Sequence, residues 1–154
     1  MRKLIAVICA IVMVMALAVP ALAAGSPSTE VVGDGITTVD PAAFPAVVAS
    51  AITGGLTPEA VVNTLGGTAP VDLADYVQIT GWAQVMEAGT KTVTIPALAG
   101  VTDLTGYMLM IVTADGQVVF LDLAQFADSY DSTTGTLTID FPVAGAFTVI
   151  APKA

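Results

Sequence analysis

The residues best suited to chemistry lie in the segment FADSYDSTTGTLTID, residues 126–140. It places the carboxylates of Asp128 and Asp131 next to the hydroxyls of Ser132 and Thr134. Calcium takes about six to eight oxygen ligands, and these four side chains could supply several of them. However, the two acids are three residues apart rather than two, and the closing glutamate of the common calcium loop is missing. A polar turn before a strand explains the same residues. We therefore expect a turn, with calcium binding as the alternative.

Carboxylates are also the catalytic groups of glycoside hydrolases, where two acids flank the bond at about 5 Å or about 6.5–9.5 Å. Most of the candidate acids lie at expected turns or strand ends, where a solvated carboxylate is ordinary. The chain also has a single tryptophan, which offers little for an aromatic sugar cleft. A small carboxylate hydrolase is therefore the least favoured function. The candidates are Glu59, Asp72, Asp75, Glu87, Asp103, Asp122 and Asp140.

Aromatic rings that stack on sugar faces would indicate a glycan-binding module. The available rings are Tyr76, Trp82, Tyr107 and Tyr130. Trp82 and Tyr107 adjoin expected strands, so a place in the core is the simpler reading for both. Tyr130 lies in the acidic segment, and we expect it to be the most exposed ring. Tyr130 and Trp82 are therefore the candidate ligand-binding residues.

Other catalytic groups are scarce in this sequence. The chain has no histidine, and its one cysteine, Cys9, lies in the apolar N-terminal run. Ser-His-Asp triads and Cys-His pairs are therefore excluded, and zinc, copper and haem lose their usual ligands. No glycine-rich phosphate loop occurs, and Lys91 has no serine at Ser-x-x-Lys spacing. We expect neither an enzyme nor a bound cofactor, with calcium as the one alternative.

The N-terminus has the pattern of a secretory signal peptide. Arg2 and Lys3 form a basic region, residues 4–19 are apolar, and Ala-Leu-Ala follows a proline. We expect cleavage between Ala23 and Ala24, which makes residues 1–23 the signal peptide. A retained anchor is the rival interpretation, but the apolar run is shorter than the ~20 residues that span a bilayer. We therefore expect no membrane insertion after cleavage.

Cleavage would change the charge balance of the chain. Removing 23 of the 154 residues leaves 131, with two lysines, Lys91 and Lys153, against all 13 acids, a net charge of −11. Nucleic acids and anionic lipids are bound by clustered Lys and Arg, so neither is an expected partner. The expected partner is a protein or glycan at the cell surface. We expect a secreted, extracellular location, or a periplasmic one if the source has an outer membrane.

The mature chain begins with polar and helical segments. Residues 24–38 are small and polar and predict a flexible leader. Residues 39–70 predict a short helical segment with a first helix that starts at Asp40-Pro41 and a second that is capped by Thr57 and ended by Gly66. The apolar side chains expected to anchor the helices to a sheet are Val47, Val48, Ile52, Val61, Val62 and Leu65.

Residues 71–154 carry the alternation of β-strands. Val93 and Ile95 share one face of a strand, and Asp115-Gly116 is typical of a tight hairpin turn. Leu137, Ile139 and Phe141 form another inward face. About six or seven short strands predict a mainly β fold, an antiparallel β-sandwich with one or two short N-terminal helices. We expect residues 39–70 to pack with 71–154 as one domain.

The order of these strand motifs also suggests a family resemblance. Gly89 precedes the strand that ends at Pro96, Asp115-Gly116 follows, and then come Gly135-Thr136-Leu137 and Gly145-x-Phe147-x-Val149. Residues 72–151 thus resemble the small immunoglobulin-like β-sandwich modules of secreted and surface proteins of Gram-positive bacteria. The resemblance implies a structural or interaction part and no site residues.

These observations together favour an exported, non-catalytic extracellular module with a structural or adhesive function. A glycan-binding module, assisted by calcium, is the alternative.

Overall fold

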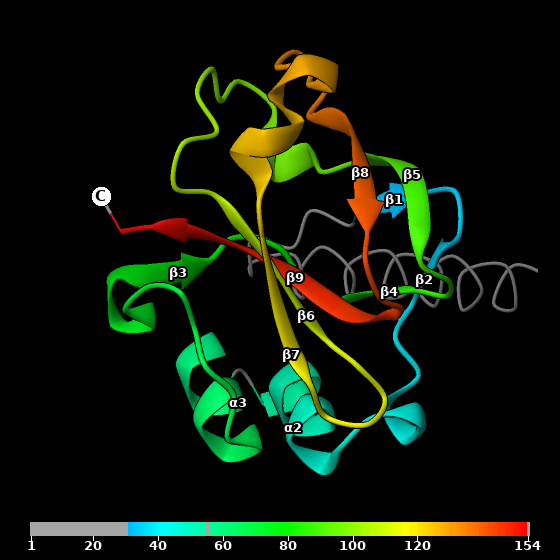
Figure 1. Cartoon of the computed structure of the whole chain (residues 1–154), viewed down its shortest axis with the longest axis vertical. Helices are drawn as coiled ribbons and strands as arrows, with labels where there is room; N and C mark the ends of the chain where they lie inside the picture. The colour runs from blue at the N-terminus through cyan, green and yellow to red at the C-terminus, as the bar shows by residue number, and fades with distance from the viewer. Residues whose placement is uncertain (1–30, 55, 154) are drawn as a thin grey trace, which may run out of the picture.

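The structure, a computed structural model, describes residues 31–54 and 56–153, and its elements form three layers (Figure 1). A small sheet packs on a larger sheet, and two α-helices cover the outer face of the larger sheet. The expected signal peptide and its cleavage site at Ala23 and Ala24 lie outside the described residues. Within those residues, no helix combines the length and apolar content needed to cross a membrane.

The N-terminal helices differ from the sequence prediction in one respect. The predicted first helix is two elements, a 3-10 turn η1 (Pro41–Ala43) and α2 (Ala46–Gly54). Asp40 caps η1 by accepting the N–H of Ala42, but Phe44 then adopts an extended backbone. The cause is Pro45, because the ring of a proline disfavours helical geometry in the residue before it. The predicted helix therefore begins again only after this proline.

The second helix, α3 (Pro58–Leu65), has the predicted limits. The Thr57 hydroxyl accepts the N–H of Ala60, and Glu59 lies in the first turn, near the positive end of the helix dipole. Gly66 ends the helix in the left-handed conformation at φ 68°, which glycine adopts without steric cost. Both caps were predicted from the sequence.

The described part of the expected flexible leader is ordered. Residues 31–38 contain two short strands, β1 (Val32–Gly33) and β2 (Ile36–Thr37). They pair with β5 (Gly89–Thr94) and β4 (Ala83–Val85) respectively. The expectation of a flexible leader is therefore wrong for this part. The reason is tertiary: Val31 is buried in the sandwich core, and the sheets supply backbone partners that a polar local sequence does not reveal.

Nine strands are found among residues 31–54 and 56–153, and all their pairings are antiparallel. The small sheet has the order β1-β5-β8, and the larger has β2-β4-β9-β6-β7, with β3 also paired to β9. The bounds are β3 (Tyr76–Gln78), β4 (Ala83–Val85), β5 (Gly89–Thr94), β6 (Met108–Val112), β7 (Val118–Asp122), β8 (Thr136–Phe141) and β9 (Gly145–Pro152). Three further 3-10 turns are η2 (Leu73–Asp75), η3 (Pro96–Leu98) and η4 (Leu123–Ser129).

The two sheets pack face to face, which confirms the predicted antiparallel sandwich. The inner face of β8 supplies Leu137, Ile139 and Phe141, as predicted, and all three are buried. They pack in one cluster with side chains of the larger sheet such as Leu109 and Phe147. The rings of Phe141 and Phe147 lie 5.4 Å apart between centroids, so the sheets are in direct contact.

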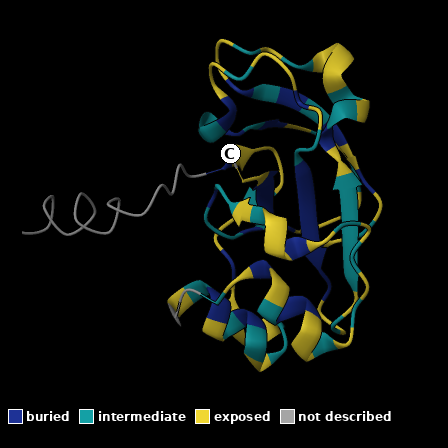
Figure 2. Ribbon diagram, turned by 90° about the vertical axis from the view of Figure 1, so that its left-hand side faces the viewer, coloured by how far each residue is buried: buried dark blue, intermediate teal, exposed yellow. Residues whose placement is uncertain are grey.

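A second apolar cluster joins the helices to the other face of the larger sheet. Val48, Val61 and Val62 are buried there against sheet residues that include Met110 and Ile150. The other three predicted anchors, Val47, Ile52 and Leu65, are partly buried in the same cluster. Strands β6 and β9 are consequently covered on both faces, and Figure 2 shows burial concentrated in the strands while loops and outer helix faces are exposed.

Candidate functional site

The acidic segment forms a closed turn between η4 and β8. The N–H of Asp131 donates to the Thr136 carbonyl at 2.8 Å, and the N–H of Gly135 donates to the Asp131 carbonyl at 2.8 Å. The Asp131 carboxylate accepts the N–H of Thr133 at 2.9 Å. Gly135 is buried at φ 76°, a conformation that a residue with a side chain rarely adopts. The backbone interactions of a polar turn account for this geometry.

The four calcium candidates differ in their surroundings, and Asp128 lies in η4, before the turn. Asp128 and Asp131 are exposed, and one carboxylate oxygen of Asp131 is already bonded within the turn. The Ser132 carbonyl accepts the N–H of Gly100 at 2.6 Å, and the Thr134 hydroxyl lies 2.9 Å from that of Thr136. Within the described residues, no three acidic, histidine or cysteine side chains gather as metal ligands. Calcium binding here stays an untested prediction.

Tyr130 is not the exposed ring that the sequence led us to expect. Its side chain is half-buried against the sandwich core, and its hydroxyl lies 2.6 Å from the Leu98 carbonyl and 2.7 Å from that of Val101. Burial raises the pKa of the Tyr130 phenol above its ordinary value, and the charges of Tyr107 and Asp131 raise it further. The expectation of an exposed platform is wrong, because Tyr130 joins η4 to the loop that follows η3.

The other aromatic rings are divided between the two cores. Trp82 and Tyr76 are half-buried in the cluster beneath the helices, whereas Tyr107 and Tyr130 pack against the sandwich cluster. The indole Nε1 of Trp82 is buried without a hydrogen-bond partner among the described residues. The four rings therefore do not form one row on the surface.

The candidate carboxylates of a hydrolase are all exposed. Several act as local caps: Asp72 accepts the N–H of Ala74, and Asp122 accepts that of Ala124, each at 3.0 Å. Asp103 accepts both the hydroxyl and the N–H of Thr105, and these two bonds lower the pKa of its carboxyl. Capping the start of a short helical turn is a structural use of an aspartate.

The buried polar side chains of the described region are threonines: Thr80, Thr113 and Thr148. The Val149 N–H donates to the Thr80 hydroxyl at 2.9 Å, and that hydroxyl lies 3.2 Å from the Thr148 hydroxyl. The Thr148 hydroxyl in turn donates to the Thr80 carbonyl at 3.0 Å. This chain of hydrogen bonds bridges β9 to the gap between β3 and β4. Sequence reasoning missed it because the two threonines are 68 residues apart.

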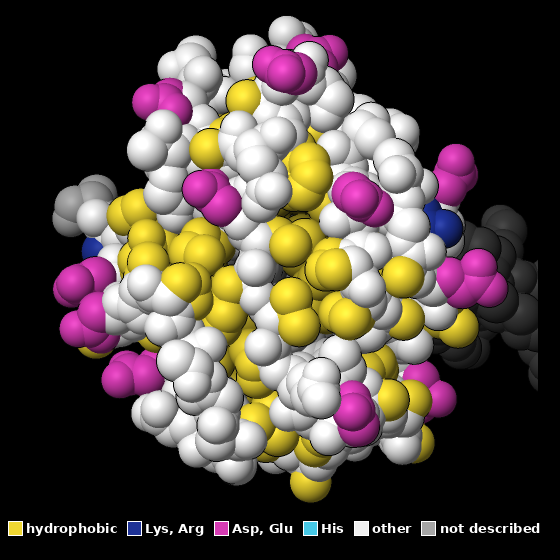
Figure 3. Space-filling view, viewed as in Figure 1, with side chains coloured by type: hydrophobic (Ala, Val, Ile, Leu, Met, Phe, Trp, Pro, Cys, Tyr) yellow, Lys and Arg dark blue, Asp and Glu magenta, His cyan; other side chains and the backbone are white. Residues whose placement is uncertain are grey.

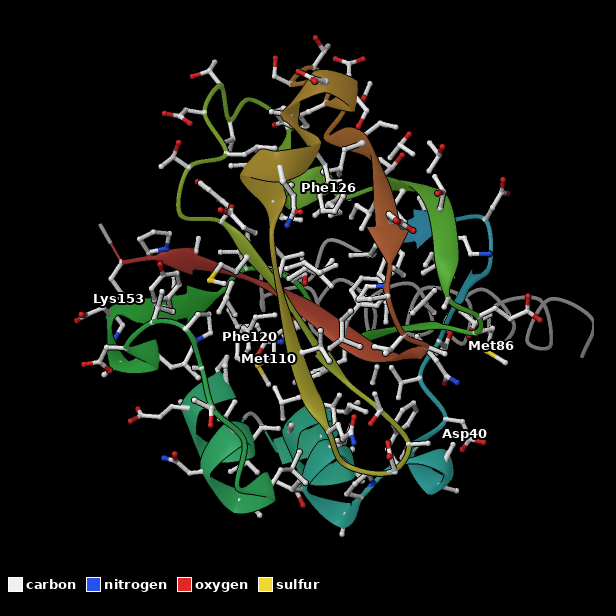
Figure 4. All side chains as sticks on the ribbon, viewed as in Figure 1. Asp40, Met86, Met110, Phe120, Phe126 and Lys153 are labelled. Carbon is white, nitrogen blue, oxygen red and sulfur yellow. The ribbon has the colours of Figure 1, made fainter. Side chains whose placement is uncertain are left out.

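Strand β7 and η4 carry apolar side chains that are not fully buried. Val118, Val119, Phe120 and Leu121 of β7 are partly exposed, as is Phe126 of η4. Val118 and Phe120 pack against the cluster beneath the helices, and the other three pack against the sandwich cluster. We refer to these five residues as the β7 band. Figure 3 shows apolar side chains across the middle of this face, surrounded by acids, with basic side chains only at its margins. Figure 4 labels Phe120 beside β7, next to the buried Met110, and Phe126 near η4. The β7 band was not predictable from the sequence, because an edge strand is recognisable only once the sheet order is known.

No protein-family model, curated protein or solved structure matches this chain. The resemblance to immunoglobulin-like surface modules therefore stays a prediction.

Proposed function

We propose that this protein is an exported, non-catalytic module that acts by presenting a surface to a protein partner outside the cytoplasm, in a structural or adhesive function. The observation that carries the proposal is the β7 band, an apolar strip on a face whose charged side chains are mostly acidic. Contiguous apolar surface surrounded by polar groups is typical of interaction sites. The partner is expected at the cell surface or, in a source with an outer membrane, in the periplasm.

The chemistry of the chain supports a binding function over catalysis. The sequence has no histidine, and its one cysteine lies within the predicted signal peptide. The buried polar side chains among the described residues are threonines, two of which are engaged in holding strands together. The candidate acids are exposed, and Asp72, Asp103, Asp122 and Asp131 bond to nearby backbone. Export is supported by the basic, apolar and Ala-x-Ala segments of residues 1–23.

The proposal is tested by expressing the full chain in its source and measuring its processing and binding. Mass spectrometry of the exported product is expected to show Ala24 as the first residue. The purified product, labelled with a fluorophore, is expected to bind isolated cell envelopes saturably. Protease treatment of the envelopes should abolish binding, whereas periodate oxidation of glycans should not. Cytoplasmic retention or the absence of saturable binding would contradict the proposal.

A matched treatment separates a protein partner from a sugar. Loss of binding after periodate but not after protease would contradict a protein partner and indicate a glycan-binding module. Repeating that measurement with calcium and with a chelator would then show whether the acidic turn contributes. Substitution of Asp128 and Asp131 by asparagine is the variant for that comparison, because it removes the charges and keeps the size of both side chains.

A further inference from the structure

Strand β7 ends the larger sheet, and its hydrogen-bond pattern follows from the hairpin it forms with β6. The N–H of Thr113 donates to the Gln117 carbonyl at 2.9 Å. The N–H of Leu123 donates to the Tyr107 carbonyl, also at 2.9 Å. Bonded pairs alternate along an antiparallel ladder, so Val119 and Leu121 direct their backbone groups toward β6.

The backbone groups at the alternate positions of β7 therefore point away from β6. Val118 and Phe120 direct their N–H and C=O groups outward from the sheet. Among the described residues, neither side chains nor backbone outside the ladder bond to these groups, and no other strand lies along this edge. The edge of β7 is thus an unpaired row of donors and acceptors.

The outer edge of β8 shows how this fold covers a comparable strand. The Ser129 hydroxyl accepts the N–H of Thr138 at 2.9 Å and lies 3.3 Å from the Thr138 carbonyl. The carbonyl of Thr136 accepts the N–H of Asp131 at 2.8 Å. Native proteins cover or charge an edge because an open one pairs with other chains. In the described part of the chain, the β7 edge has no such cover, and it carries four apolar residues in succession, so it is suited to accept another strand.

The charges around the edge define what could pair with it. Exposed acids lie at both ends of β7, Asp115 in the hairpin turn and Asp122 at the last position of the strand. Antiparallel pairing of two copies would bring the Asp122 end of each strand toward the Asp115 end of the other. Like charges would then meet at both ends of the pairing, and the chain as a whole has a net charge of −9. A segment with basic ends is complementary instead.

We propose that the free edge of β7 binds an extended segment of a protein partner as an added antiparallel strand. The segment spans about five residues, the length of β7, with apolar side chains at alternate positions, and carries Lys or Arg at each end. Outward N–H and C=O groups of Val118 and Phe120 supply the backbone bonds. The β7 band contacts the apolar side chains of the segment. This inference rests on the proposed function and assigns its binding surface and partner chemistry.

The probe for this site is the fluorescent peptide acetyl-Lys-Val-Thr-Val-Thr-Val-Lys-amide, titrated into the exported protein by fluorescence anisotropy. Saturable binding is expected. The same peptide N-methylated at its three central residues should bind at least about tenfold more weakly, because it loses donors for the strand pairing. A peptide with Glu in place of both Lys residues should also bind about tenfold more weakly. Equal binding of the N-methylated peptide would overturn the proposal.

Two variants of one residue test the protein side. Val118→Pro removes the outward N–H without removing a ladder bond to β6, whereas Val118→Ala keeps that N–H and shortens the side chain. We expect about a tenfold loss of peptide affinity for the proline variant and less than about a threefold loss for the alanine variant. Circular dichroism should show that both are folded. If the proline variant does not fold, the N-methylated peptide gives the deciding result.

The envelope assay separates failure of this inference from failure of the proposed function. Loss of envelope binding in Val118→Pro supports the β7 edge. Undiminished envelope binding by the folded proline variant would overturn the assignment of the β7 edge as the binding site and leave the proposed function in place. No envelope binding by the unsubstituted protein would contradict the proposed function itself. Sedimentation that shows a dimer dissociated by Val118→Pro would overturn the basic segment in favour of a second copy.

Discussion

Substitution of Tyr130 by phenylalanine tests whether this residue is a structural clasp rather than a ligand platform. The change removes only the hydroxyl and leaves the half-buried ring against the sandwich core. That hydroxyl has one proton and two carbonyl acceptors, at 2.6 Å on Leu98 and 2.7 Å on Val101. A hydrogen bond contributes about 0.5–1.5 kcal/mol to stability, and a buried acceptor left unpaired costs more. We therefore expect the free energy of unfolding to fall by about 1–2 kcal/mol.

The assay is urea denaturation followed by circular dichroism, with the slope of the free energy against urea compared between proteins. Tyr76→Phe is the matched control, because Tyr76 is also half-buried but its hydroxyl has no hydrogen bond among the described residues. We expect this control to change the free energy of unfolding by less than about 0.5 kcal/mol. Equal effects of the two substitutions would refute the structural reasoning about Tyr130.

The same residue predicts a change in stability at alkaline pH. The pKa of Tyr130 is raised in the folded protein, chiefly by burial, so the unfolded chain loses this proton first. The stability linked to this group is therefore complete below about pH 10 and is lost as pH rises through the raised pKa. Tyr130→Phe should remove this part of the alkaline loss. An unchanged pH profile in the variant would contradict the assignment.

Three further predictions concern the interior and the acidic turn. Thr80→Val should lower the free energy of unfolding by about 1–3 kcal/mol, because it leaves the buried N–H of Val149 without an acceptor. Thr80→Ser keeps the hydroxyl acceptor and should lower it by about 1 kcal/mol. Urea denaturation measures both variants, and equal losses would refute the hydrogen-bond network. Gly100→Ala should lower the free energy of unfolding by about 1–2 kcal/mol, because Gly100 has a positive φ. Gly135→Ala should lower it more, because Gly135 also has a positive φ and an added Cβ there would meet backbone atoms, whereas at Gly100 it would not. Thermal melts with equal shifts for the two variants would contradict this prediction. Calcium at millimolar concentration should leave the melting temperature unchanged, and a rise that Asp131→Asn abolishes would instead establish a cation site.

The sequence predicted the local elements of this fold well. The caps of α3 at Thr57 and Gly66 and the hairpin at Asp115-Gly116 depend on neighbouring residues alone, so their signals are complete within a few positions. Alternation in β8 predicted which side chains face the core. The exception is the helix broken before Pro45, where the sequence contained the signal but its effect on Phe44 was underestimated.

Features that depend on contacts between distant parts of the chain were not predictable in this way. Tyr130 lies among polar neighbours, which favours exposure, yet its carbonyl partners come from 29 and 32 residues earlier in the chain. The Thr80–Thr148 bridge likewise depends on strands that are distant in sequence. The open edge of β7 depends on the order of strands in the sheet, because its residues alone would suit a central strand equally well. These properties belong to the tertiary arrangement.

Amide hydrogen exchange along β7 reports on the open edge residue by residue, and it can be measured by NMR on the exported protein with and without the lysine-ended peptide. We predict that the amides of Val119 and Leu121 are protected in both states, because they bond to β6. Those of Val118 and Phe120 should exchange rapidly in the free protein and become protected when the peptide binds. Protection of the Val118 and Phe120 amides before any peptide is added, or no gain in protection at saturating peptide, would contradict an open β7 edge that binds a strand.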